Sequence, residues 1–461
     1  MDIKELTSPE RLPAMIIDDL KNKTLPVPPW SRLVKEYDQK QHPVMDKRLY
    51  PDKTTKRGTE KMTRITLGLQ KLAVKRMTGL IFGIPVQRVW KPQNDQEKKA
   101  AEIMESIFMK NRIDSLNRER SKFLYAGCEF VTIWYTQEQD TEYAGEKTEL
   151  KLRARSFSPM NGDQLFPLFD EFDDLVALSV EYTRKENNVT VTYFDTYTAT
   201  EHIRWRNDGG HIEEELREDI SAELGKIPGI YVWKPEPVWE DESENVFEAE
   251  WTYSRQGNYI RKNARPNWVV FSNGNVQFGK EAAPDNSGRN VLRYGKDDKA
   301  GYVTWEQAID SIKFHVDQIC QNFFKQLQLP DMSMENMKLT PMSGEARKMV
   351  FIDAEMKVTD ESGIWLEGFD REINVVRAHA ANMYPQYKDA INSVQVEVEI
   401  TPYKIKDEGE KINNLTNATG GKAIMSQKTA IQYLGYAEDV EKELEQIRTE
   451  SEVHLFDEPT I

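Results

Sequence analysis

Hydrophobic positions in the first quarter of the chain recur at helical spacing. Between Met62 and Leu80, apolar residues follow one another mostly at steps of three and four, as expected for a helix with one buried face. Similar patterns predict helices over residues 10–20, 95–109 and 113–125. The first quarter is therefore predicted to be mainly helical.

From residue 129 the spacing of apolar positions changes from helical to alternating. Runs of β-branched and aromatic residues alternate with polar ones, and Asn, Asp and Gly separate the runs. The predicted strands cover residues 129–135, 150–157, 175–182, 189–193 and 202–206. Asn207-Asp208-Gly209-Gly210 predicts a turn, because glycine accepts positive φ. We expect an antiparallel, sheet-rich block that ends near Gly225-Lys226-Ile227-Pro228, where prolines begin to fix an extended backbone.

Two long helices are predicted on either side of a small β segment. The first covers residues 242–263, and the second begins with Thr304 as its N-cap and runs to Leu327. Between them, residues 264–303 hold short strand-like pieces among Gly and Asn turns. The first helix carries a stripe of Val246, Phe247, Trp251, Ser254 and Asn258, and the apolar stripe of the second includes Trp305, Ile309, Ile312, Val316 and Phe323.

The last third of the chain is predicted to be mostly helical. A loop at 328–343 precedes a segment from Gly344 to Met383 that contains no proline, which predicts one helix far longer than the mean of roughly 11 to 12 residues. Such a helix needs a large partner or many identical ones, and Ser362-Gly363 is its expected kink. A strand at 394–400 follows, and then helices at 408–418, 427–434 and 440–450, with Ser426 as an N-cap.

Composition and charge restrict the classes of function. Of the 461 residues, 39 % are apolar and 30 % are charged, so much of the surface must be polar, whereas 10 Trp and 18 Phe argue against a disordered chain. The net charge of −15 argues against a protein that wraps nucleic acid in Lys and Arg. Any contact with DNA should be loose or repulsive.

Motifs for nucleotide and metal chemistry are absent from the sequence. Gly420-Gly421-Lys422-Ala423 lacks the first glycine and the hydroxyl of a phosphate-binding loop. The six histidines are scattered without metal-ligand spacing, and the acidic pairs Asp173-Asp174 and Asp297-Asp298 are expected by chance among 77 carboxylates. We therefore predict no catalytic residue, no metal and no cofactor.

Targeting and redox signals are equally sparse. Cys128 and Cys320 have no paired spacing and are predicted to be buried thiols in a reducing cytoplasm. No apolar run reaches the 18 or more residues of a membrane span, and no signal sequence opens the chain. A soluble protein without membrane partners is expected.

Three local motifs carry a resemblance to a known family. They are Gly225-Lys-Ile-Pro228 before the first long helix, Ser343-Gly344-Glu-Ala346 at the start of the longest helix, and the ending Ile424-Met-Ser426 … Thr429 … Glu441-Lys-Glu443 … Glu450. With the order of elements, they resemble the portal proteins of tailed bacteriophages, specifically those of Bacillus siphophages. The resemblance covers most of residues 120–455, whereas the first hundred residues match only in helical character.

The resemblance implies an α+β portal fold in several parts. These would be a β-rich wing at 1–241 with the strand 394–400 added, stem helices at 242–263 and 304–327, an α/β clip at 264–303, a tunnel loop at 328–343, a long kinked helix at 344–383 and a helical crown at 401–461. The family implies a non-enzymatic ring of twelve subunits at one capsid vertex. Terminase packages double-stranded DNA through this ring, which later lets the DNA out. Implied partners also include the head-tail adaptor and the major capsid and scaffolding proteins.

Three groups of residues are the candidate sites under this resemblance. The tunnel loop would present Met332, Met334, Met337, Lys338 and Met342 to passing DNA, with Lys338 as the main phosphate contact. The clip would dock partners through Arg265, Lys280, Arg289, Arg293 and Lys296, since its six basic residues outnumber four acidic ones. The stripe from Trp305 to Phe323 would form the subunit interface.

The assignments of the loop and the clip, and the function itself, have alternatives. The loop methionines could pack against a neighbouring subunit, because methionine is mainly a core filler. The charges of the clip could belong to solvated turns. Another head-tail connector and a DNA-processing enzyme are the competing functions.

Overall fold

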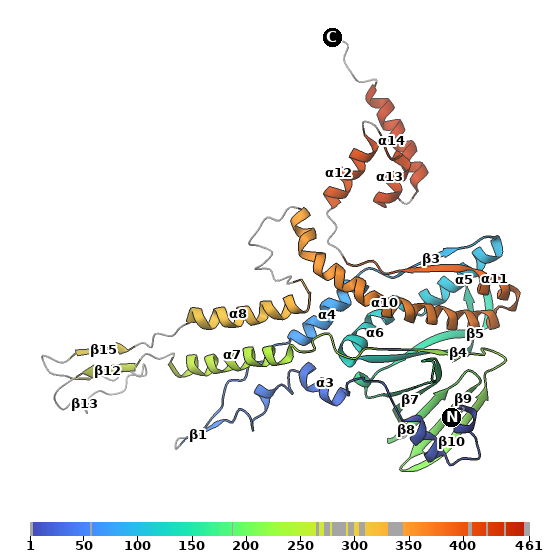
Figure 1. The fold of residues 1–461 in the computed structure, drawn as a ribbon. Helices are drawn as coiled ribbons and strands as arrows, with labels where there is room; N and C mark the ends of the chain where they lie inside the picture. Colours follow the sequence, from blue (N-terminus) through green and yellow to red (C-terminus); the bar gives the residue numbers. More distant parts are fainter. Residues whose placement is uncertain are drawn as a thin grey trace, which may run out of the picture.

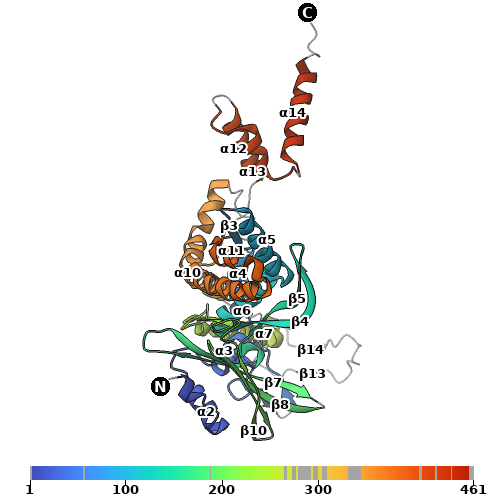
Figure 2. The same ribbon diagram turned by 90° about the vertical axis from the view of Figure 1, so that its right-hand side faces the viewer.

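The computed structural model describes residues 3–55, 58–186, 188–263, 309–330, 344–403, 408–420, 423–437 and 439–455, together with the strands at 267–271, 277–278, 292–293 and 299–303. Figure 1 shows a body of helices and sheets, from which two long helices, called rods below, project side by side. A group of C-terminal helices extends from the body in another direction, as both views show (Figures 1 and 2).

Helices dominate the first quarter, as predicted. They are α1 (Ile3–Leu6), α2 (Pro13–Leu20), α3 (Trp30–Tyr37), α4 (Leu69–Phe82), α5 (Asp95–Lys110) and α6 (Ile113–Gly127), with a 3-10 turn at Pro43–Met45 and a hairpin of β1 (Lys53–Thr55) and β2 (Gly58–Glu60). Asn94 caps α5 by accepting a hydrogen bond from the Glu97 backbone N–H at 2.8 Å. The prediction of a helix from Met62 was wrong for its first seven residues, because this segment is extended and bonds to another helix.

The predicted sheet-rich block consists of two antiparallel sheets. The five-stranded sheet has the order β10-β9-β8-β7-β6, and the three-stranded sheet has the order β11-β4-β5. Their bounds are β4 (Glu129–Tyr143), β5 (Glu146–Phe157), β6 (Gln164–Phe169), β7 (Leu175–Glu186), β8 (Val189–Tyr197), β9 (Glu201–Asp208), β10 (His211–Asp219) and β11 (Gly229–Trp233). The predicted turn joins β9 to β10, with Gly209 and Gly210 at φ of 59° and 97°. Val131, Leu178 and Tyr231 belong to one buried cluster that both sheets share.

One boundary needed correction. The sheet block does not end at 225–228, because β11 follows Pro228 directly and pairs with β4 through Tyr231 and Val131. This error concerns a partner distant in sequence, which a local pattern does not identify. The predicted strand at 394–400 is β16 (Gln395–Glu399). It pairs with β3 (Gln87–Lys91), which lies within residues 1–241, in a separate two-stranded sheet where Val396 lies opposite Trp90.

The two predicted long helices form the projecting rods. They are α7 (Ser243–Asn263) and α8 (Ile309–Gln326), and the strands β12 (Asn267–Phe271) and β15 (Lys299–Val303) pair at their far end (Figure 1). The short strands β13 (Gln277–Phe278) and β14 (Leu292–Arg293) pair in the same module. The predicted helix, β module and second helix are therefore present in that order, while Thr304 lies outside the described residues.

The longest helix, α10, spans Gly344–Met383 as predicted and crosses the body. Trp365 and Phe369 on this helix are buried in the cluster that also holds Phe82 and Phe130. After a 3-10 turn at Pro385–Tyr387, α11 (Lys388–Ser393) leads into β16, and the chain ends in α12 (Glu408–Thr419), α13 (Gln427–Leu434) and α14 (Val440–Leu455). Ser426 caps α13 by accepting a hydrogen bond from the Thr429 backbone N–H at 3.1 Å, as predicted.

Candidate functional site: the paired rods and their anchor

The two rods bury their apolar faces within the single chain. Val246 and Ala249 on α7 and Val316 and Phe323 on α8 are each no more than 1 % exposed. Val246, near the start of α7, and Phe323, near the end of α8, belong to the same buried cluster. The helices are therefore antiparallel, so that α7 leaves the body and α8 returns to it.

An extended segment from Met62 to Leu67 fastens α7 to the body through a ladder of hydrogen bonds. The backbone N–H groups of Thr63, Ile65 and Leu67 donate to the side chains of Asn258, Ser254 and Glu250 at 2.6, 2.9 and 2.6 Å. Two residues of extended chain advance about 6.6 Å and four residues of helix about 6 Å, so the two spacings match. The polar residues on the α7 stripe are buried because they satisfy this backbone.

A buried histidine lies at the body end of the same ladder. His42 Nδ1 lies 2.7 Å from Glu250 Oε1, and both side chains are fully buried. His42 Nε2 lies 2.9 Å from the Glu36 carbonyl oxygen, and it must carry the proton there because a carbonyl only accepts. This histidine therefore joins α3 to α7 by polar contacts that an apolar side chain could not replace, and Glu250 in turn accepts from the Leu67 backbone N–H.

Gly257 marks the closest approach of α7 to the extended segment, and it provides a test of the ladder. A Cβ atom at Gly257 would lie 2.9 Å from Thr63 Cγ2. We expect Gly257→Ala to push residues 63–67 away and cost about 1–3 kcal/mol, which hydrogen exchange of the amides of Thr63, Ile65 and Leu67 would report as faster exchange. Gly363→Ala is the matched control, because that helical glycine has no atom within 4 Å of the added Cβ. Equal protection in the two variants would contradict the ladder's role.

The returning end of α8 is held by two cations before the chain enters residues 331–343. Lys357 Nζ on α10 donates to the Leu327 carbonyl at 2.7 Å, and Arg76 on α4 donates to the Pro330 carbonyl at 2.9 Å. The Arg76 guanidinium also lies 3.9 Å from the centre of the Phe324 ring. Burial lowers the pKa of Lys357, since the charged form is desolvated. These contacts fix the end of the α8 segment, up to Pro330, relative to α4 and α10.

Most of the predicted site residues lie outside the described part of the chain. These are Met332, Met334, Met337, Lys338 and Met342 of the loop, Arg265, Lys280, Arg289 and Lys296 of the β module, and Trp305. Arg293 lies in β14 opposite Gln277. The roles of these loop, β-module and stem residues stay predictions.

The described part of the predicted subunit-interface stripe lies mostly inside the subunit. Ile309 begins α8, Ile312 is half-buried, and Val316 and Phe323 are buried between the rods and the body. The apolar area of Val316 and Phe323 is thus already covered in one chain. Phe314, on the other face of α8, is 67 % exposed. If α8 meets a neighbouring subunit, this exposed face is the one available.

The anchoring residues were not predicted from the sequence. His42 gave no signal, and Glu250 is one of many glutamates. The only local sign was the presence of Ser254 and Asn258, four residues apart, on an otherwise apolar stripe. Polar residues at that spacing indicate a buried backbone partner, but the sequence does not show which segment supplies it.

The described residues contain neither a cluster suited to a metal ion nor a membrane-spanning helix. Within the part of the chain that the structure describes, no three His, Cys, Asp or Glu side chains are arranged to hold a metal ion. No described helix has the length and apolarity needed to cross a bilayer.

Comparison with known proteins connects this architecture to a family. Among the solved structures similar to this chain are three from a gene transfer agent. The neck of the empty particle, computed with C6 symmetry, has 8 % identity and a TM-score of 0.43, covering 80 % of this chain and 89 % of that one. The neck of the native particle, computed with C12 symmetry, has 12 % identity and a TM-score of 0.40, covering 92 % and 98 %. The native virion has 10 % identity and a TM-score of 0.39, covering 88 % and 93 %.

The family assignment rests on the sequence match rather than on these distant structures. No curated protein matches the chain significantly. A family model described as phage portal protein, SPP1 Gp6-like, matches residues 25–454, which is nearly the whole chain. The order of sheet block, two rods around a β module, and long helix was expected from that same resemblance. The chain therefore belongs to the SPP1 Gp6-like family of phage portal proteins.

Proposed function

We propose that twelve copies of this chain form a ring at one capsid vertex, and that double-stranded DNA passes through the ring during packaging and ejection. The observation that carries the proposal is the pair of rods, anchored to the body at one end and carrying a β module at the other (Figure 1). Repeated around an axis, such rods form a tube. The sheet block is then the wing, the rods are the stem, the β module is the clip and α12–α14 are the crown.

The charges on the described face of α8 suit a channel that does not hold DNA. Its exposed ionic side chains between residues 311 and 326 are Lys313, Asp317 and Lys325, which nearly balance one another. Each cation bound to a phosphate releases counterions and strengthens binding, so few unbalanced cations mean weak binding. DNA contact would be independent of sequence, and the duplex could slide.

We assign the residues between α8 and α10 to a tunnel loop in that channel. Lys357 and Arg76 hold the chain where it enters the loop, and α10 begins at Gly344. The methionines at 332, 334, 337 and 342 would offer adaptable apolar side chains. Lys338 would then be the loop's main phosphate contact.

The clip is proposed to dock terminase and the head-tail adaptor through its basic residues. The double variant Arg289→Glu with Arg293→Glu should still form rings but lose partner capture at least tenfold, because the favourable charge becomes repulsive. A pull-down with the purified partner would measure this loss. Lys4→Glu with Lys35→Glu, far from the clip, is the control. Undiminished capture by the clip variant would exclude the docking role.

Partners on the capsid side are proposed to bind the outer body. The major capsid and scaffolding proteins would contact the wing, because the rods and clip are committed to the channel and to docking. Portal proteins of this family are structural components rather than enzymes. We propose no catalytic step, metal or cofactor for this chain.

The assembled mass of the purified protein tests the ring. Native mass spectrometry should give a species of twelve subunits of 53.6 kDa each, at a salt concentration near physiological. A chain that stays monomeric at all concentrations up to tens of micromolar would contradict the proposal.

A further inference from the structure

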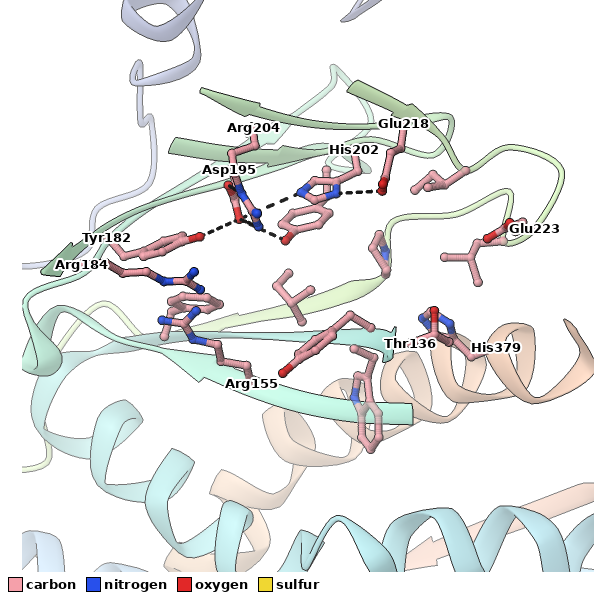
Figure 3. A pocket seen from close by; sticks show the side chains of 18 residues that line it. Thr136, Arg155, Tyr182, Arg184, Asp195, His202, Arg204, Glu218, Glu223 and His379 are labelled. Atoms are coloured by element: carbon pink, nitrogen blue, oxygen red, sulfur yellow. Dashed lines mark hydrogen bonds and ion pairs between the residues drawn. The ribbon is translucent and has the colours of Figure 1, made fainter. Parts of the chain in front are cut away.

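A cavity of about 330 Å³, lined by apolar, aromatic and charged side chains, lies between the two sheets of the wing (Figure 3). In one half of it, the Asp195 carboxylate has its partners within the chain. Arg204 donates two hydrogen bonds to Asp195, at 2.7 and 2.9 Å, and Tyr182 donates a third at 3.1 Å. Burial, followed by the nearby Asp195 charge, raises the pKa of Tyr182 to about 12, so this hydroxyl keeps its proton. His202 Nε2, 4.0 Å from Asp195, is buried in this half without a hydrogen-bond partner.

The other half of the cavity holds two guanidinium groups without an anion. Arg155 on β5 and Arg184 on β7 lie 4.7 and 5.1 Å from the centre of the same Tyr182 ring. Figure 3 shows them converging on one end of the cavity from the two different sheets. Among the described residues, no carboxylate comes within ion-pair distance of either guanidinium. The charge of Arg155 partly offsets the rise that burial causes in the pKa of Asp163, but from beyond ion-pair distance. Two converging guanidiniums beside aromatic rings are suited to a carboxylate that is next to an aromatic side chain.

A surface turn of the same chain has the complementary chemistry. The β6–β7 turn, residues 170–174, reads Asp-Glu-Phe-Asp-Asp, and Phe172 is 76 % exposed. The Asp170 carboxylate shapes the turn by accepting hydrogen bonds from the backbone N–H groups of Phe172 and Asp174, both at 2.9 Å. In the described structure, Glu171, Asp173 and Asp174 have no ion-pair partner. The turn thus presents unpaired carboxylates around an exposed aromatic ring.

Geometry prevents the turn from entering the cavity of its own subunit. Strand β7 begins at Leu175, directly after the turn, and pairs with β8 without interruption from Leu178 through Arg184. Nine residues of strand span about 30 Å, so the turn and the two arginines lie at opposite ends of β7. A contact between them requires a second copy. It would be a head-to-tail contact, the class that closes into rings.

We propose that the turn 170–174 of one subunit binds the Arg155 and Arg184 end of the cavity in the neighbouring subunit. The carboxylates of Glu171 and Asp174 pair with the two guanidiniums, and the Phe172 ring lies beside them. This inference rests on the proposed ring, and it names the residues that one copy contributes to the next. It also gives Asp174, one member of the acidic pair Asp173-Asp174, a role in assembly rather than in metal binding.

Charge reversal in two variants tests the pairing. The cavity variant is Arg155→Glu with Arg184→Glu, and the turn variant is Glu171→Lys with Asp174→Lys. Asp170 and Asp173 are kept, because the first caps the turn and the second has a φ of 63°. Each variant alone places like charges together and should need at least tenfold more protein for half-assembly, as measured by mass photometry. In a one-to-one mixture with alternating subunits, the lysines of the turn variant meet the glutamates of the cavity variant. At the next contact, the native carboxylates in the turn of the cavity variant meet the native arginines of the turn variant. The mixture should therefore assemble as the wild type does.

Matched controls separate this contact from general charge effects. Lys185→Glu changes the neighbouring residue of β7, whose side chain points to the opposite face. Glu138→Lys with Asp140→Lys reverses two exposed carboxylates on β4. Both control proteins should assemble like the wild type.

The outcomes distinguish this inference from the proposed function. A wild type that forms no rings contradicts the proposed function itself. If the wild type forms rings, two results overturn the turn-to-cavity contact alone. One is normal assembly of both variants when each is assayed by itself, and the other is a mixture of the two that does not recover wild-type assembly. Should a variant misfold, oxidation of a mixture of Glu171→Cys and Arg184→Cys subunits decides: a disulfide-linked dimer supports the contact, and none in assembled rings refutes it.

Discussion

Replacing Glu372 by alanine is expected to destabilise the protein by about 3–5 kcal/mol, because it leaves a buried cation without its partner. Glu372 lies on α10 and accepts hydrogen bonds from Arg120 at 3.0 and 2.6 Å and from Trp134 Nε1 at 2.8 Å. Arg120 is fully buried, so water does not replace the lost carboxylate. This triad joins α6, β4 and α10. Its loss should loosen the attachment of the longest helix to the wing.

A neighbouring ion pair on the same helix provides the control for Glu372. Glu367 pairs with Arg371 four residues away, and both side chains are largely exposed. Its replacement by alanine should cost no more than about 1 kcal/mol. Urea unfolding followed by tryptophan fluorescence measures both variants. Equal shifts in the first unfolding transition would contradict the assigned importance of the buried triad.

Aspartate at Val316 and aspartate at Phe314 are expected to fail in different ways. Val316 is 1 % exposed, so Val316→Asp buries an unpaired charge between the rods and should destabilise the stem by several kcal/mol in the monomer. Phe314 is 67 % exposed, so Phe314→Asp should leave the subunit folded. If the exposed face of α8 contacts the next subunit, the same charge should weaken assembly at least tenfold.

Two measurements separate these effects. Limited proteolysis of the monomer should show faster cleavage in the rods for Val316→Asp only, and mass photometry should show reduced assembly for Phe314→Asp. Wild-type assembly by Phe314→Asp would place the subunit contacts elsewhere than on this face of α8.

The sequence predicted elements well wherever the pattern was local. The bounds of α10 at Gly344 and Met383 follow from an unbroken run without proline, and Ser426 is the cap that its position before α13 indicated. The hairpin at Gly209 and Gly210 needed only glycines that tolerate positive φ. Alternation of apolar residues likewise predicted β7 and β8. These features depend on neighbours within a few residues.

Errors arose where the partner was distant in sequence. Residues 62–68 were assigned to a helix but are extended, because α7, almost two hundred residues later, supplies acceptors for their backbone. The strand that begins at Gly229 was missed because its five residues lie among prolines and resemble a linker in sequence. Only the structure shows that they pair with β4. The apolar stripe of α8 was assigned to a subunit interface, whereas Val316 and Phe323 pack inside the chain. Periodicity shows that a face is buried, but it does not show what covers it.

Cryo-electron microscopy of the purified protein tests the central claim most directly. The account predicts closed rings of twelve subunits with a central channel, in which α7 and α8 line up around the channel and the β module forms one rim. Solid particles, open filaments, or rings whose rods point away from the axis would contradict it.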